Sequence, residues 1–121
     1  VTLDKLIKKY NFKKVIFLKI DIEGAEYNAL LGLKNSLTKG IIDFILFEYN
    51  QTWIKFGSSL LDVFNFITKF DYKLYRIRPN DLLLVEKYDY TLEDFTYSNY
   101  LIAKKKIKLP LQYKRKVNPM T

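Results

Sequence analysis

The chain has 121 residues, of which 49% are hydrophobic, enough for one core but few for a complete α/β enzyme. It contains no cysteine and no histidine, which excludes disulfides, thiol nucleophiles, and histidine as a base or metal ligand. The formal net charge is +8 at pH 7.

A positive charge of this size fits a nucleic-acid or anionic-surface partner, which the basic clusters between Lys104 and Lys116 could serve. Only Arg76, Arg78 and Arg115 are arginines, the residue type best suited to bidentate phosphate and guanine contacts, so nucleic acid is disfavoured. We find no apolar run long enough to span a membrane and no signal-peptide core, and we therefore expect a cytoplasmic protein.

The first half of the chain predicts a β-α-β unit. An amphipathic helix begins after Thr2, a candidate N-cap, and the apolar run 15–22 is typical of a strand buried on both faces. Apolar spacing over 25–37 predicts one helix that ends at Gly40, and 41–49 is a second buried strand. The two strands are expected to be parallel, with a right-handed crossover.

The second half predicts a helix followed by antiparallel strands. Ser59 and Asp62 form a candidate capping box at the start of the helix. Segments 73–78 and 82–86 flank a Pro-Asn-Asp turn and predict a hairpin, and 97–103 predicts a last strand. Residues 104–121 lose periodicity and are expected to form a frayed or extended basic tail.

Three acidic residues lie around the end of the first buried strand. They are Asp21, Glu23 and Glu26. Along the chain, the strand is followed by this acidic cluster, which includes a glycine, and then by a helix. Ligands of open α/β sheets bind at the carboxyl ends of the strands, so this position predicts a functional site. The alternative is that Glu23 and Glu26 only favour the positive N-terminus of the following helix, which is worth about 0.3–1 kcal/mol each.

A second polar group follows the next strand, where Glu48 and Asn50 are expected beside Asp21 because consecutive parallel strands are usually neighbours. Such oxygen-rich sets suit Mg²⁺, but we favour a hydrogen bond from Glu48 to a substrate hydroxyl or a loop amide and assign no metal. Trp53 is a candidate for the wall of an acceptor pocket, with core packing as the alternative.

The motif KIDIEGAEYNALLG, preceded by VTLDKLI and followed by ILFEYN, resembles the core signature of the FkbM-type methyltransferases. The resemblance continues through FDYKLYRI to SNYLIAKK and so covers residues 1–105. It implies S-adenosylmethionine as cofactor and a hydroxyl of a sugar or natural product as methyl acceptor. It also implies a Rossmann-like α/β sheet in which 15–22 is the fourth strand and 41–49 the fifth.

For a methyltransferase of this kind we assign hypothetical roles to the strand-end residues. Ile20 and Asp21 would contact the cofactor, and Asp21 would stand where cofactor and acceptor meet. Glu23 and Glu48 would orient or deprotonate the acceptor. The candidates for contact with the acceptor are Glu26, Asn50 and Trp53.

The family's glycine-rich cofactor loop has no counterpart here, because none of the four glycines forms a GxG pattern. We therefore interpret residues 1–103 as the C-terminal half of a methyltransferase domain, inactive alone, and 104–121 as its tail. In the family's sheet the fourth strand lies beside the first, so Val15 to Ile20 is expected to be an open edge that favours self-association. The alternative reading is a non-catalytic interaction module.

Overall fold

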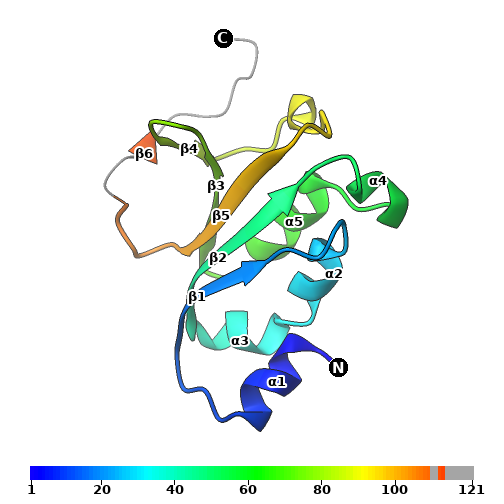
Figure 1. Ribbon diagram of the computed structural model, residues 1–121. Helices are drawn as coiled ribbons and strands as arrows, with labels where there is room; N and C mark the ends of the chain where they lie inside the picture. Colours follow the sequence, from blue (N-terminus) through cyan, green and yellow to red (C-terminus); the bar gives the residue numbers. More distant parts are fainter. Residues whose placement is uncertain (110–111, 114–121) are drawn as a thin grey trace.

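A computed structural model describes residues 1–109 and 112–113 of the chain (Figure 1). The helices are α1 (Leu3–Lys9), α2 (Glu26–Leu31), α3 (Lys34–Lys39), α4 (Trp53–Phe56), α5 (Leu60–Ile67) and the 3₁₀ turn η1 (Tyr90–Leu92). The strands are β1 (Val15–Ile20), β2 (Ile42–Tyr49), β3 (Tyr72–Ile77), β4 (Leu82–Val85), β5 (Ser98–Lys104) and β6 (Gln112–Tyr113). No helix of the described segments is long and apolar enough to cross a membrane.

The strands form one mixed sheet in the order β1-β2-β5-β3-β4-β6. β1 and β2 are parallel, which confirms the predicted β-α-β unit, and β3 and β4 form the predicted antiparallel hairpin. β5 lies between β2 and β3 and is antiparallel to both. Its central place, which the sequence pattern did not predict, joins the parallel unit to the hairpin.

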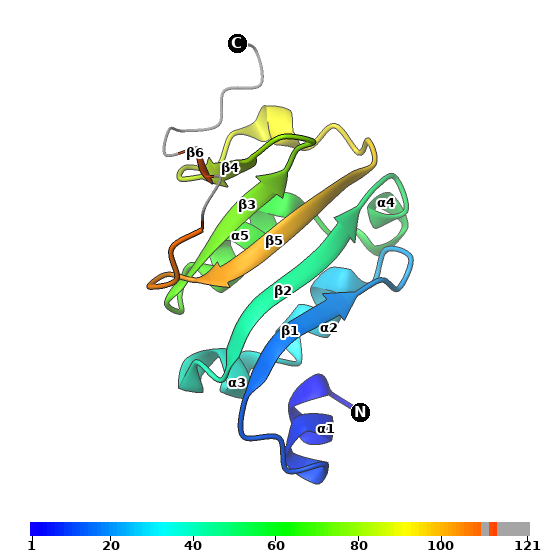
Figure 2. The same ribbon diagram turned by 60° about the vertical axis from the view of Figure 1, so that its left-hand side comes forward.

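One face of the sheet carries α2, α3 and α5 (Figure 2). The main core lies there, and its fully buried members include Ile45, Phe47 and Tyr100. The opposite face, here called the open face, carries a smaller cluster around Tyr75 and Leu101. Side chains alternate between the two faces along each strand, which explains the two separate clusters.

The prediction that the first strand is buried on both faces is wrong. Ile16 is 65% exposed and Phe17 is 53% exposed, because β1 is an edge strand that pairs only with β2 within the described segments. The strand also ends at Ile20, so the acidic segment that follows is a loop.

The predicted single helix over 25–37 is also wrong, because the chain breaks at Gly32 into α2 and α3. α1 causes the break: the Asp4 amide donates to the Gly32 carbonyl at 2.9 Å. The Asp4 carboxylate in turn accepts the amides of Asn35 and Ser36 at 2.8 and 3.0 Å and so caps α3. Gly40 ends α3 at φ +65°, as predicted.

Two predicted helix starts are confirmed. The Thr2 side chain accepts the Lys5 amide at the start of α1, and Ser59 and Asp62 form both bonds of the capping box of α5. β5 runs one residue into the segment predicted as a tail, and β6 pairs with β4. Residues 110–111 and 114–121 of that predicted tail lie outside the described segments.

Replacing Asp4 by alanine tests the link between α1 and α3. We expect D4A to lower the free energy of unfolding by about 1–2 kcal/mol, because two helix amides lose their acceptor. The matched control is K5A in the same helix, whose exposed side chain caps nothing. Equal urea midpoints for D4A and K5A would contradict this role of Asp4.

Candidate functional site

The predicted site residues gather at the sheet edge where β1 and β2 end and β5 begins, here called the acidic edge. The register pairs Ile20 with Phe47 and Glu48 with Asn99. Asp21 directly follows Ile20, the last paired residue of β1, and Glu48 directly follows its partner Phe47 on β2. Asp21 is exposed and Glu48 is half-buried, which leaves both carboxylates within reach of a ligand.

Glu26 organises the loop between β1 and α2. Its side chain is 1% exposed, and its two carboxylate oxygens accept the amides of Ile22 at 3.0 Å and Gly24 at 2.8 Å. A buried carboxylate needs such donors, and this one is fully engaged by its own loop. Glu26 therefore fixes the conformation of the loop that carries Asp21 and Glu23. The sequence predicted instead that Glu26 contacts the substrate.

The same loop has an unusual backbone. Glu23 has φ +56° and Gly24 φ +103°, a region that disfavours side chains. This geometry leaves the Glu23 side chain exposed. A Cβ on Gly24 would lie 2.7 Å from the Thr52 carbonyl oxygen and 2.9 Å from the Phe56 ring, so the two loops of the edge meet where only glycine fits.

The loop after β2 is held by its own polar groups. The Asn50 amide nitrogen donates to the Glu48 carboxylate at 3.0 Å, and the Asn50 amide oxygen accepts the Thr52 amide at 2.8 Å. Asn50 thus fixes the turn and orients Glu48, which is a positioning role. Thr52 was not singled out from the sequence, although a Thr two residues after an Asn is typical of an Asx turn.

Two residues predicted to contact ligands lie in the core. Trp53 is fully buried between Phe47 and Tyr49, with ring centroids 5.8 and 5.1 Å away, and its indole nitrogen donates to the Glu48 carbonyl. Ile20 is 5% exposed and packs into the main core. Alternation along β1 turns Ile20 to the helix side of the sheet, and Trp53 packs into the same core from α4.

A small open pocket of about 170 Å³ lies on the open face beside Glu48. Its other lining residues include Lys19, Ile77, Tyr97 and Asn99. The Tyr97 side chain is exposed. Ile77, Tyr97 and Asn99 were missed from the sequence because they follow far along the chain, and only the sheet order brings β3 and β5 to this side of β2.

Glu93 is a second residue that sequence reasoning missed. Its carboxylate accepts the Tyr49 hydroxyl at 2.8 Å, the Tyr88 hydroxyl at 3.0 Å and the Leu61 amide at 3.0 Å. Burial, together with the bond to this carboxylate, raises the pKa of Tyr49 well above its usual range. Glu93 therefore ties the start of α5 to the end of β2 behind the site.

The described segments contain no group of three or more acidic side chains arranged to hold a metal ion. The pocket at the acidic edge is also below the roughly 300–1,000 Å³ of typical small-molecule sites. These residues can bind and orient a hydroxyl group, but they do not enclose a molecule of cofactor size.

Gly24 and Gly57 form a matched pair for testing the loop contact. Both have positive φ, but a Cβ on Gly57 meets nothing within 4 Å. We expect G57A to lower the free energy of unfolding by about 1–2 kcal/mol through backbone strain alone. G24A should cost about 1–3 kcal/mol more, because the added methyl group also collides with the Thr52 loop. Equal losses in thermal unfolding would refute the contact.

Comparison with known proteins gives one match. A search of curated proteins and a search of solved structures each found nothing similar. A family model described as the methyltransferase FkbM domain matches residues 1–74, from α1 into β3, and includes the whole loop of Asp21, Glu23 and Glu26. The match covers more than half of the chain, and the chain therefore belongs to the FkbM methyltransferase family.

Proposed function

We propose that this chain provides the acceptor side of a methyltransferase site that uses S-adenosylmethionine to methylate a hydroxyl of a sugar or natural product. The observation that carries the proposal is the pair of accessible carboxylates, Asp21 and Glu48, at adjoining strand ends. Family membership supports the reaction class. The sulfonium cofactor supplies an activated methyl group, and the acceptor hydroxyl must lose its proton.

The chain's own residues would bind and orient that hydroxyl. Glu48, held by Asn50, is the proposed base or orienting group, because a carboxylate on a fixed strand accepts a hydroxyl proton in a defined direction. Asp21 would stand at the junction of cofactor and acceptor, and Glu23 would contact the acceptor from the loop. The described residues of the acidic edge surround only about 170 Å³, which is too small to enclose the cofactor.

The sheet order is compatible with the second half of a Rossmann-like methyltransferase sheet. Two parallel strands, one antiparallel strand and a strand parallel to the first two lie in the order β1-β2-β5-β3. We therefore propose residues 1–103 as the C-terminal part of such a domain and 104–121 as an appended basic segment.

Carboxamide variants test the catalytic roles. Residues 1–103 would replace the matching segment of a complete FkbM-domain methyltransferase, and transfer of labelled methyl groups would be followed. E48Q or D21N should lower kcat about 100-fold or more, as loss of a general base does. E86Q is the control, because Glu86 is an exposed carboxylate beyond the far end of β4. An unchanged kcat in both D21N and E48Q would exclude these roles.

Calorimetry with the isolated chain tests where the cofactor is held. We expect no measurable S-adenosylmethionine binding in the micromolar range, because the chain has no GxG loop and no cavity of cofactor size at the acidic edge. Micromolar binding by residues 1–121 would show that this chain alone forms a cofactor site.

The exposed edge of β1 supports a second proposal, that the isolated chain associates with itself through Val15 to Ile20. Ile16 and Phe17 are exposed, and Lys19 is the single charge in the strand. F17K should shift the chain toward monomer in size-exclusion chromatography with light scattering. Y10K, which replaces an exposed aromatic of the α1 C-cap, is the control. A monomeric wild type with slowly exchanging β1 amides would contradict the proposal.

A further inference from the structure

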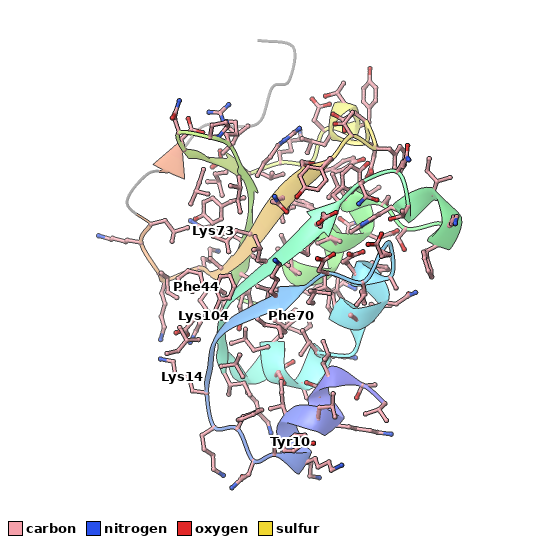
Figure 3. The ribbon with its side chains drawn as sticks, in the orientation of Figure 1. Tyr10, Lys14, Phe44, Phe70, Lys73 and Lys104 are labelled. Atoms are coloured by element: carbon pink, nitrogen blue, oxygen red, sulfur yellow. The ribbon has the colours of Figure 1, made fainter. Side chains whose placement is uncertain are left out.

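A basic pocket lies at the end of the sheet opposite to the acidic edge. It has a volume of about 610 Å³, within the range of small-molecule sites. Its walls come from the end of α3, the turn between α5 and β3, and the end of β5. Figure 3 labels Phe70 and Lys104, two of its lining residues, near the start of β2.

Lysines dominate the lining of this basic pocket. The five are Lys39, Lys69, Lys104, Lys105 and Lys106, and the only acid among the lining residues is Asp71. Lys104 is paired with Asp43 at 3.6 Å. The other four form no salt bridge within residues 1–109 and 112–113. These four exposed lysines and the exposed Asp71 leave three net positive charges on the lining, which a bound anion would neutralise.

The ordinary explanation is that the lysines balance the negative C-termini of α3 and α5. It applies to Lys39 and Lys69, although backbone amides already occupy two carbonyls of the last turns: Gly40 donates to Leu37 and Phe70 to Ile67, both at 3.1 Å. It does not apply to the three lysines at and beyond the end of β5, which face the same pocket from a different element.

The frame of the basic pocket is rigid. The Tyr72 hydroxyl donates to the Ile42 carbonyl at 2.6 Å, and the Lys105 amide donates to the Asp71 carbonyl at 2.8 Å, so β2, β3 and β5 are tied together at its floor. The Phe70 ring is half-buried and packs edge-on against Phe66 at 5.3 Å. A rigid backbone frame that carries exposed lysine side chains and one aromatic wall suits a compact anion with an organic group.

We propose that the basic pocket binds a diphosphate group, free or as part of a nucleoside diphosphate or a diphosphate lipid headgroup. At neutral pH the terminal phosphoryl group carries about −1.5 to −2 charges and the inner one about −1, so a diphosphate roughly balances the three net positive charges of the lining. Lysine suits this ligand as a mobile point charge, without the planar fork of arginine. The concave shape favours a compact ligand over a duplex or a flat membrane.

Calorimetric titration of the 121-residue chain with inorganic pyrophosphate tests the proposal. We expect binding that weakens at least tenfold in K69Q/K105Q and that falls steeply with added salt. K5Q/K87Q removes the same number of charges from exposed lysines outside the pocket and should bind like the wild type. Circular dichroism melting of both variants verifies that they are folded.

Two further binding measurements distinguish a nucleotide from a lipid as the source of the diphosphate. If a nucleoside diphosphate binds more tightly than pyrophosphate, and F70A removes this difference in affinity, the natural ligand is a nucleotide. If the chain binds vesicles that contain diphosphate lipid headgroups, and pyrophosphate displaces it from them, the natural ligand is a lipid. Three results would overturn the proposal: no pyrophosphate binding, equal weakening in the two double variants, or binding of single-stranded DNA that pyrophosphate does not compete.

Discussion

The buried carboxylate of Glu26 is the interaction on which the acidic edge depends. It accepts the amides of Ile22 and Gly24 and so holds a loop whose backbone passes through positive φ at Glu23 and Gly24. A strained loop persists only where its surroundings determine it, and here one side chain supplies both bonds. With the loop fixed, Asp21 stays directly after the end of β1, at the same edge of the sheet as Glu48, and Gly24 lies against the Thr52 carbonyl.

Local signals predicted much of the fold. β-branched apolar runs predicted the parallel pair β1 and β2, and side-chain oxygens at Thr2 and Ser59 predicted two helix starts. The break at Gly32 was not predictable from periodicity, because it depends on the bond from the distant Asp4 amide. The exposure of β1 was missed for a related reason: an apolar run indicates a strand, but it does not show which neighbours cover it.

The predicted site residues differ in how far the structure leaves them accessible. Asp21, Glu23 and Glu48 do reach an accessible edge. Glu26 and Trp53 are buried, and each supports the site through a hydrogen bond to the backbone. Sequence spacing identified the loops after β1 and β2, but it could not show which side chains of these loops are buried. Residues from β5, such as Asn99, join the edge only through the sheet order.

The two ends of the sheet have opposite character, with carboxylates at one end and the basic pocket at the other. The most direct test of the acidic edge is an amide-resolved NMR titration of the labelled chain with a series of monosaccharides. We expect chemical-shift changes at Asp21, Glu23 and Glu48 that are lost in E48Q and kept in E86Q. Shifts confined to the basic pocket, or the same shifts in E48Q, would contradict the assignment of the acidic edge as the acceptor site.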